Sequence, residues 1–306
     1  MKPSLSVLIP AYNSEKTIIK CINSILSQSY NNIEIIVIND GSTDATKNIL
    51  EKLNYENIKI INNESNLGIS RSLNRGLDQC NSDYIARMDA DDISTFDRFT
   101  KQIDYLEKHQ NIDVLGCYQL AVGGYNNGPI RTKINDDEIK SKLLVGPTML
   151  HPTVVFRGRF IYDNNVRYDP NCYLSEDYEL WSRISPIAQF SNLPEILYEY
   201  NWDSQKNWEL NNPKLMESLT FIWNREISRN GIKPTKRNLH IHMILSNRVQ
   251  EIKIYDILLL FIYINRLIIN NFLRGTINSK VFIFDRYNEY YLILRKFARN
   301  VLYGNS

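Results

Sequence analysis

Three carboxylates occur within four positions, at Asp89, Asp91 and Asp92, directly after the apolar run 84–88. The run predicts a short buried strand, and on an extended backbone Asp89 and Asp91 project to the same side. Two parallel carboxylates at a strand end suit a divalent cation whose other ligands are water and substrate phosphates. The alternative is an ordinary acidic loop, because Asp side chains often bond to the backbone in turns.

A second acidic pair, Glu176 and Asp177, follows Ser175 at the predicted start of a helix. A carboxylate in the first helical turn lies near the positive end of the helix dipole, so we expect it to stay ionised near neutral pH. Such a group can act as a general base that accepts a hydroxyl proton. The alternative is that these are ordinary first-turn acids after a Ser cap.

Buried strands that alternate with helices must position these groups. Unbroken apolar runs predict strands at 5–9, 33–38, 58–61 and 84–88. Apolar residues at helical spacing predict helices between them, at about 18–26, 44–53 and 68–77. This order predicts an α/β fold with a mostly parallel sheet covered by helices. Ligands bind beyond the carboxyl ends of such strands. We therefore expect the loops at Tyr12, Asp40 and Asp89 to converge on one crevice.

The chain of 306 residues is 43% hydrophobic and 23% charged, which suits one large domain with an appendage. We predict a catalytic domain at 1–210, with a nucleotide-binding half at about 1–115 and an acceptor half at about 116–210. Residues 211–306 are predicted to form a helical, basic C-terminal region. From residue 231 onward there are 12 Lys and Arg and 4 Asp and Glu, which makes this part basic. The residues before 231 contain 24 Lys and Arg and 30 Asp and Glu, which makes them acidic.

The four cysteines are widely spaced and form no C-x-x-C pair, so neither a zinc site nor a disulfide framework is indicated. Reduced thiols in a cytoplasmic protein are expected. No apolar stretch reaches about 18 residues, so a spanning helix is not expected. The surplus charge of the C-terminal region favours peripheral contact with the inner face of an anionic membrane. Its apolar stripes equally fit packing on the catalytic domain or in a homodimer.

Six motifs occur in a specific order along residues 4 to about 185. They are Pro-Ala-Tyr-Asn at 10–13, Asn-Asp-Gly-Ser-Thr-Asp at 39–44, Asn-Leu-Gly-Ile-Ser at 66–70, Ala-Arg-Met-Asp-Ala-Asp-Asp at 86–92, His-Pro-Thr-Val-Val-Phe-Arg at 151–157 and Glu-Asp-Tyr-Glu-Leu-Trp at 176–181. This part of the chain resembles family 2 glycosyltransferases, most closely bacterial enzymes of capsule, O-antigen or lipooligosaccharide assembly. The resemblance implies a GT-A fold and inverting transfer of a sugar from a nucleotide-sugar donor, with a UDP-linked donor favoured.

The resemblance also implies roles for individual residues. It places Pro10, Ala11 and Tyr12 around the base of the donor, with Asp40 bonding the pyrimidine ring. Asp89, Ala90 and Asp91 match the family's D-x-D motif, which implies a divalent metal, Mn²⁺ or Mg²⁺. Asp91 then contacts the metal directly, and Asp89 holds the ribose or a water ligand. Asp177 matches the catalytic base, and Glu176 helps to hold the acceptor.

Two positions leave alternatives open. His151 fits either a place beside the diphosphate or metal, or a purely structural role. Many family members carry an Arg directly before the Asn of the third helix, but this chain has Leu73 there. The positive charge toward the donor is then expected from Arg71, Arg75 or Arg87.

The Q-x-x-R-W signature of processive synthases is absent, so a non-processive hexosyl- or N-acetylhexosaminyltransferase is predicted. Its acceptor is expected to be a glycan or a lipid-linked glycan, and nucleic acid is not an expected partner. One rival is a nucleotidyltransferase, but residues 10–14 offer no Gly-rich phosphate loop. An oxidoreductase is disfavoured because no G-x-G-x-x-G follows the first strand. A non-catalytic sugar-binding protein on this fold is the third alternative.

Overall fold

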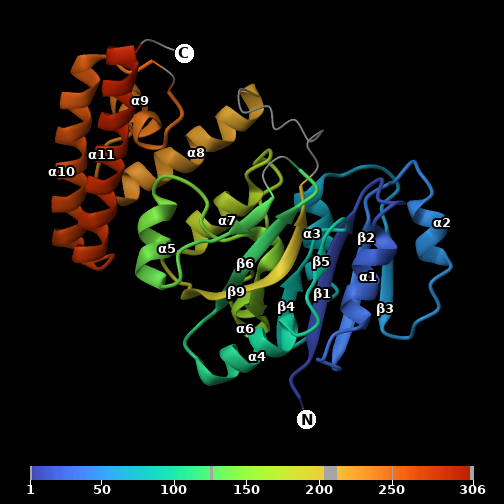
Figure 1. The fold of residues 1–306 in the computed structure, drawn as a ribbon. Helices are drawn as coiled ribbons and strands as arrows, with labels where there is room; N and C mark the ends of the chain where they lie inside the picture. The colour runs from blue at the N-terminus through green and yellow to red at the C-terminus, as the bar shows by residue number, and fades with distance from the viewer. Residues whose placement is uncertain (1, 125–126, 203–211, 250, 304–306) are drawn as a thin grey trace. The chain divides into compact units, whose positions relative to one another are not determined.

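The computed structural model describes residues 2–124, 127–202, 212–249 and 251–303, and its contacts divide the chain into two compact units (Figure 1). The first unit comprises 1–135 and 149–210, and the second comprises 136–148 and 211–306. The sequence analysis placed 136–148 within the catalytic domain. The contacts correct this prediction, because that segment belongs with the C-terminal helices.

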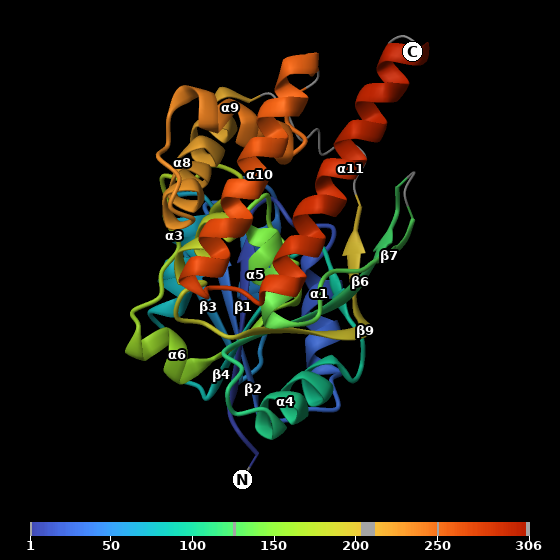
Figure 2. The same ribbon diagram turned by 90° about the vertical axis from the view of Figure 1, so that its left-hand side faces the viewer.

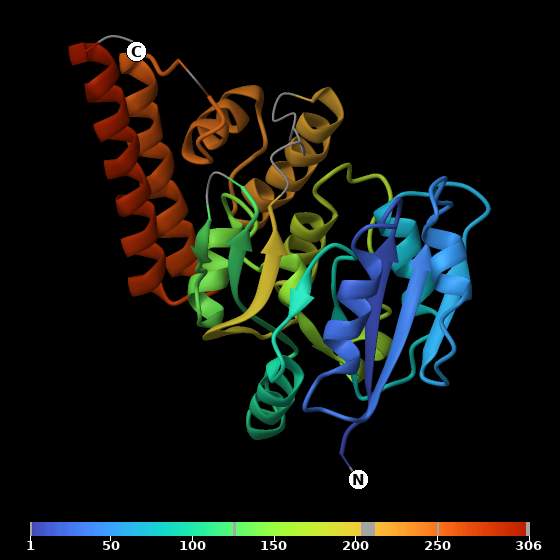
Figure 3. The ribbon, with the colours of Figure 1, turned by 45° about the vertical axis from the view of Figure 1, so that its right-hand side comes forward.

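The first unit is built on one sheet with the strand order β3-β2-β1-β4-β8-β6-β9-β5, and β7 pairs with β6. The strands are β1 (Leu5–Ala11), β2 (Ile33–Asn39), β3 (Ile58–Asn62), β4 (Tyr84–Arg87), β5 (Ile93–Ser94), β6 (Val114–Val122), β7 (Gly128–Ile130), β8 (Val155–Arg157) and β9 (Phe190–Asn201). Strands β3, β2, β1 and β4 pair in parallel (Figure 3). The α/β class is as predicted.

The second half of the sheet is mixed rather than parallel. Strand β8 runs antiparallel to both β4 and β6, whereas β9 is parallel to β6. Strands β5 and β7 add antiparallel pairs at β9 and β6. The prediction of a mostly parallel sheet thus describes the first half of the sheet, because only the βα alternation of that half carries this information in the sequence.

Helices cover both faces of this sheet. They are α1 (Ile18–Leu26), α2 (Thr46–Glu51), α3 (Ile69–Leu77), α4 (Arg98–Lys108), α6 (Gly158–Asp163) and α7 (Glu176–Ile184), with a 3₁₀ turn, η1 (His151–Thr153). Helices α1 and α4 share a buried apolar cluster with one face of β1, which includes Val7. On the other face, α3 approaches closely at Gly76, where an added Cβ would lie 2.8 Å from Ile38 Cδ1.

Strand β9 was not predicted from the sequence. Pro194 lies inside it, and a proline normally argues against a strand interior because it cannot donate to the ladder. The pairing of β6 with β9 shifts register between Cys117 and Gln119, opposite the segment that contains Pro194. A bulge of this kind accommodates the proline.

The second unit is helical and has its own core. It comprises α5 (Asp136–Leu143), α8 (Pro213–Arg229), α9 (Lys236–Leu245), α10 (Ile254–Arg274) and α11 (Ser279–Tyr303). Helices α10 and α11 lie side by side (Figure 2). Leu144, which follows α5, packs into a cluster with residues of α9, α10 and α11 such as Ile241, Leu260 and Phe282.

One helix in the described part of the chain, α10, has the length and composition of a membrane span. This differs from the sequence expectation that no segment qualifies. Of its most apolar 18 residues, 33% are buried inside the protein.

Candidate active site

The loop after β2 is held against the ends of β1 and β3 through Asp40. The Asp40 backbone N–H donates to the carbonyl oxygen of Ala11 at 2.8 Å. The buried Asp40 carboxylate accepts hydrogen bonds from Asn63 Nδ2 at 2.7 Å and from the Leu67 and Gly68 amides at 2.8 and 2.9 Å. Three of about four acceptor positions of this carboxylate are therefore filled by the protein itself.

The conformation of the loop after β2 requires a glycine at position 41. Its φ is +65°, and an added Cβ would lie 2.4 Å from the Ser65 carbonyl carbon. The loop after β1 joins the same network, because Asn13 Oδ1 accepts from the Thr43 amide at 2.8 Å. The loops after β1, β2 and β3 thus meet at the carboxyl edge of the sheet, and the loop after β3 was not part of the expectation from the sequence.

The segment after β4 is a turn and not an extended strand end. The Asp92 amide approaches the Asp89 carbonyl oxygen at 3.4 Å, and residues 90–91 lie in the turn. Asp89 and Asp91 therefore do not alternate on an extended backbone, contrary to the prediction from the sequence. Both side chains remain partly exposed, whereas Ala90 is buried.

Asp92 is a structural residue. Its carboxylate accepts hydrogen bonds from the Tyr198 hydroxyl and the Asn201 amide, both at 2.7 Å. The Tyr198 hydroxyl in turn accepts from the Asp89 amide at 3.1 Å. Burial, with added repulsion from Asp89, raises the pKa of Asp92 to about 7. This carboxylate fastens the turn to β9.

Arg87 is the positive group among these carboxylates. Its Nη2 lies 2.7 Å from Asp89 Oδ1, and its side chain is only 5% exposed. The Nε and Nη1 atoms of this guanidinium are buried without a hydrogen-bond partner. A buried cation with free donors is costly unless a bound anion satisfies them. Arg87 is thus suited to meet an anionic ligand.

Glu176 and Asp177 begin α7 beside His151 and Tyr168. Glu176 Oε1 lies 3.9 Å from His151 Nδ1, and His151 Nε2 is 2.9 Å from the Tyr168 hydroxyl. The charges of Arg87 and Asp89 act on both Glu176 and Asp177. The two predicted acidic groups are therefore parts of one site.

Burial shifts the pKa values of Glu176, Asp177 and His151. Burial, followed by repulsion from Asp177, raises the pKa of Glu176 to about 7. Burial also raises the pKa of Asp177, although its Oδ1 accepts a hydrogen bond from the Tyr178 amide. The helix dipole was expected to keep Asp177 ionised, but the cost of burying its charge outweighs the stabilisation by the dipole. Burial and the charge of Arg87 lower the pKa of His151 well below its usual value, so the ring is neutral.

The fit to a divalent cation rests on few protein ligands. Among the described residues, no three His, Cys, Asp or Glu side chains are grouped as a closed metal site. Mg²⁺ and similar ions are often held by one or two carboxylates with substrate phosphates, and the partly exposed pair Asp89 and Asp91 fits that pattern. His151 fits it poorly, because its two ring nitrogens face Tyr168 and Glu176.

Other predicted donor residues lie along the same edge. Pro10 and Ala11 end β1, and the side chain of Tyr12 is 47% exposed just beyond them. Arg71 is exposed on α3. Arg75 donates instead to Asn63 Oδ1, which links it to the Asp40 network.

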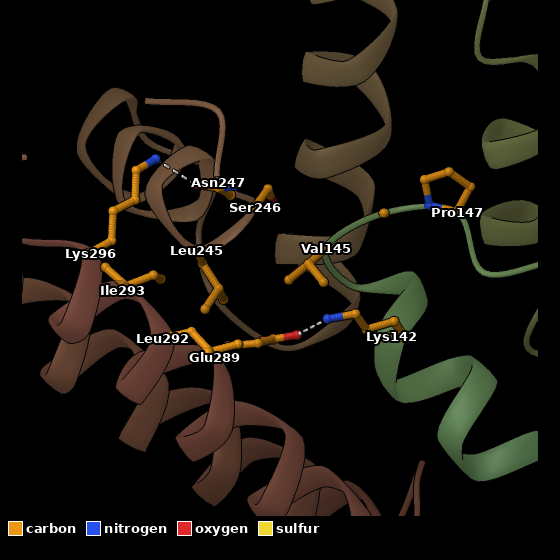
Figure 4. A pocket seen from close by; sticks show the side chains of 11 residues that line it. Lys142, Val145, Pro147, Leu245, Ser246, Asn247, Glu289, Leu292, Ile293 and Lys296 are labelled. Atoms are coloured by element: carbon orange, nitrogen blue, oxygen red, sulfur yellow. Dashed lines mark hydrogen bonds and ion pairs between the residues drawn. The ribbon is translucent and has the colours of Figure 1, made fainter. Parts of the chain in front are cut away.

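A separate pocket lies within the second unit (Figure 4). It has a volume of about 330 Å³ and is lined by residues that include Lys142, Leu245 and Lys296. Lys142 is paired with Glu289 at 2.8 Å and Lys296 Nζ with Asn247 Oδ1 at 2.9 Å. None of the carboxylates of the candidate active site lines this pocket.

Sequence reasoning missed Asn63, Tyr168 and Tyr198. Asn63 follows the third strand, so the rule that found Asp40 and Asp89 could also have found it. Tyr168 contacts His151 across 17 residues, and Tyr198 contacts Asp92 across 106. No local pattern in the sequence marks either tyrosine.

Comparison with known proteins decides the family. The model of glycosyl transferase family 2 matches residues 6–167, which span β1 to the residue before Tyr168. The chain belongs to glycosyltransferase family 2.

Relatives of this family 2 glycosyltransferase extend the match. An uncharacterized glycosyltransferase of Haemophilus influenzae is 33% identical over 268 residues, 83% of this chain and 81% of the relative. The amylovoran biosynthesis glycosyltransferase AmsE of Erwinia amylovora is 32% identical over 63% of this chain and 74% of its own length.

Solved structures share the GT-A fold. Residues 1–349 of S. aureus TarS, in complex with UDP-GlcNAc, align with a TM-score of 0.64 and 19% identity over 99% of this chain and 95% of that one. The mannosyltransferase PcManGT of Pyrobaculum calidifontis, in complex with GDP-Man and Mn²⁺, aligns with a TM-score of 0.59 and 14% identity over 99% and 88%. At these identities the similarity concerns the fold.

Proposed function

We propose that this family 2 glycosyltransferase transfers a single sugar, with inversion, from a UDP-linked donor to a glycan or lipid-linked glycan acceptor in bacterial surface polysaccharide synthesis. The observation that carries the proposal is the buried Arg87. Two of its guanidinium nitrogens have no partner, and three acidic groups, Asp89, Glu176 and Asp177, lie near it. The similarity to AmsE, a glycosyltransferase of amylovoran biosynthesis, supports polysaccharide synthesis, and the UDP-GlcNAc complex of TarS supports a UDP-linked donor.

In this proposal the donor lies along the carboxyl edge of the sheet. Pro10, Ala11 and Tyr12 flank its base, and the remaining acceptor position of Asp40 receives a ring N–H. The free Nε and Nη1 of Arg87 donate to the diphosphate, which favours Arg87 over Arg71 and Arg75 as the missing positive charge. Charge-assisted hydrogen bonds of this kind are the strong ones.

Asp177 is the proposed general base. It accepts the proton of the acceptor hydroxyl as that oxygen attacks the anomeric carbon, and the bond from that carbon to the diphosphate oxygen breaks. A base is most effective when its pKa lies near the working pH, and burial moves the pKa of Asp177 upward in that direction. Glu176, buried and facing His151, orients the acceptor side of the site.

Asp91 and Asp89 are the proposed protein ligands of a divalent cation, Mn²⁺ or Mg²⁺, and His151 is left out of that set. When bound, such an ion stabilises negative charge on the leaving diphosphate. The Mn²⁺ complex of a protein with the same fold supports this assignment.

A cytoplasmic location is also part of the proposal. The four cysteines are buried and form no disulfide, which suits a reducing compartment. A homodimer has no specific support in the contacts described above.

Binding of nucleotide sugars tests the donor class. Thermal unfolding with Mn²⁺ should show stabilisation by UDP-sugars and not by GDP- or dTDP-sugars, because a ligand of the native state raises its unfolding temperature. The reaction product distinguishes a glycosyltransferase from a nucleotidyltransferase. A glycosyltransferase releases UDP, whereas a nucleotidyltransferase would release or consume pyrophosphate. Formation of pyrophosphate would overturn the proposal.

A further inference from the structure

The outer face of the α10–α11 hairpin is apolar along its length. On α10, large apolar side chains recur at helical spacing and remain exposed, with Ile254 78%, Leu258 62% and Phe272 72% accessible. Its opposite side is buried in the second unit through residues such as Leu260 and Leu267. A helix of 21 residues is about 30 Å long, so the stripe is extensive.

The exposed stripe of α11 adjoins that of α10. Phe284 and Tyr291 are 69% and 61% accessible on α11. At the seam, the rings of Phe261 and Tyr290 lie 5.7 Å apart, and the Tyr287 hydroxyl donates to Asn265 Oδ1 at 3.0 Å. Figure 2 shows the two helices side by side. Exposed apolar surfaces of this extent usually mark an interaction site.

The exposed charged residues of the hairpin are almost all positive. Three of its four acids, Asp256, Asp285 and Glu289, are buried, and only Glu251 is exposed within residues 251–301. Seven cations are exposed over the same residues, namely Lys253, Arg266, Arg274, Lys280, Arg295, Lys296 and Arg299. The hairpin therefore presents apolar and aromatic side chains together with an almost purely positive set of charges.

We propose that this face docks on an anionic lipid bilayer, with α10 and α11 lying in the plane of its surface. An apolar stripe flanked by Lys and Arg is the pattern of interfacial helices, and tyrosines such as Tyr255 and Tyr291 suit the headgroup level. A second copy of the chain fits less well, since it would bring two positive faces together. Spanning is also disfavoured, because the inner side of α10 carries the buried polar residues Asp256 and Asn271 and packs on other helices.

Vesicle binding by the full chain tests this proposal without any nucleotide sugar, so its result is independent of transfer activity. The wild type should cosediment with vesicles containing phosphatidylglycerol and only weakly with pure phosphatidylcholine. Each basic residue near an anionic surface is worth about 1 kcal/mol. The triple variant Arg266→Glu, Arg295→Glu, Arg299→Glu should therefore weaken binding on the order of a hundredfold or more.

A second variant changes the apolar stripe. Leu258→Ser, Ile269→Ser, Phe272→Ser alters three exposed positions and should also abolish cosedimentation, with an unchanged circular dichroism spectrum. The matched control reverses three exposed cations of the first unit, Lys20→Glu, Lys52→Glu and Lys108→Glu, and should bind as the wild type does. Equal loss in the control would show a non-specific charge effect and overturn the proposal. A dimer in sedimentation velocity that the serine variant dissociates would assign the face to a second copy instead.

Discussion

The carboxylates of the candidate site differ in what their oxygens contact. Asp92 bonds Tyr198 and Asn201 inside the protein, and Asp40 is mostly satisfied by the loop after β3. Asp89 and Asp177 are less enclosed, and both lie near Arg87, whose Nε and Nη1 lack hydrogen-bond partners. Aspartates of one site thus have different tasks, and their burial and hydrogen-bond partners distinguish them.

The first prediction concerns the base and the metal ligand. Asp177→Asn should lower kcat by about 10²–10⁴-fold while leaving donor binding unchanged, because only proton acceptance is lost. Asp91→Asn should instead weaken metal-dependent donor binding, measured by calorimetry with UDP and Mn²⁺. The control Asp104→Asn, on the exposed side of α4, should change neither quantity. Near-normal turnover of Asp177→Asn would reject the base assignment.

The second prediction concerns pH and Glu176. Its folded-state pKa of about 7 lies above the ordinary 4.5, so its contribution to stability is complete below about 4.5 and is lost as pH rises through 7. Glu176→Gln removes that ionisation. The variant should gain about 1–3 kcal/mol over wild type at pH 8, with a smaller difference at pH 5, in chemical unfolding experiments.

The control for Glu176→Gln is Glu64→Gln, the same change at an exposed position. Its free energy of unfolding relative to wild type should not depend on pH. A gain for Glu176→Gln that is equal at pH 5 and pH 8 would contradict a raised pKa.

At the scale of elements, the site is an edge where loops from adjacent strands are bonded to one another. Arg98, fully buried in α4, extends this linkage, because its guanidinium donates to the Arg87 and Pro152 carbonyl oxygens at 3.2 and 3.1 Å. It joins the end of β4 to the 3₁₀ turn that holds His151. The relative positions of Arg87 and His151 therefore depend on a helix that contributes nothing to the chemistry.

The third prediction belongs to the loop after β2. Gly41→Ala should destabilise the protein by about 1–3 kcal/mol and weaken donor binding, because a positive φ and a Cβ at 2.4 Å from Ser65 both oppose it. Thermal unfolding and UDP titration would measure the two effects. Gly146→Ala is the matched control, since its Cβ would meet nothing within 4 Å. Equal unfolding temperatures for the two variants would contradict the argument.

At the scale of the whole molecule, the second unit includes a segment inserted in the sequence of the first. Residues Ile139, Leu143 and Leu144 are at most 1% exposed. Lys142 pairs with Glu289, and Arg286 Nη2 donates to the Ser141 carbonyl oxygen at 2.9 Å. The C-terminal helices thus contact α5 and cover Leu144, which follows it.

The fourth prediction follows from this insertion. A chain truncated after residue 210 should aggregate, because each large apolar side chain left uncovered forfeits about 1.5–3 kcal/mol of burial. Adding Ile139→Ser, Leu143→Ser and Leu144→Ser to the truncated chain should restore its solubility in size-exclusion chromatography. A truncated chain that is monodisperse without these changes would contradict the role assigned to the second unit.

The sequence by itself determined the first half of the sheet and most of the chemical groups at its edge. Apolar periodicity is local, so it revealed β1 to β4 and the helices between them, and strand-end logic then located Asp40 and Asp89. The family motifs supplied Asp177 and Glu176. The basic charge of the C-terminal region was also evident from composition alone.

Only the tertiary structure decided how these groups differ. Burial raises the pKa of Glu176, the partners of Asp92 make it structural, and the free nitrogens of Arg87 single it out from Arg71 and Arg75. The mixed order of the later strands and the assignment of 136–148 to the second unit likewise depend on contacts between distant segments. Pairing, desolvation and coverage are properties of neighbours in space, which a pattern along the chain does not record.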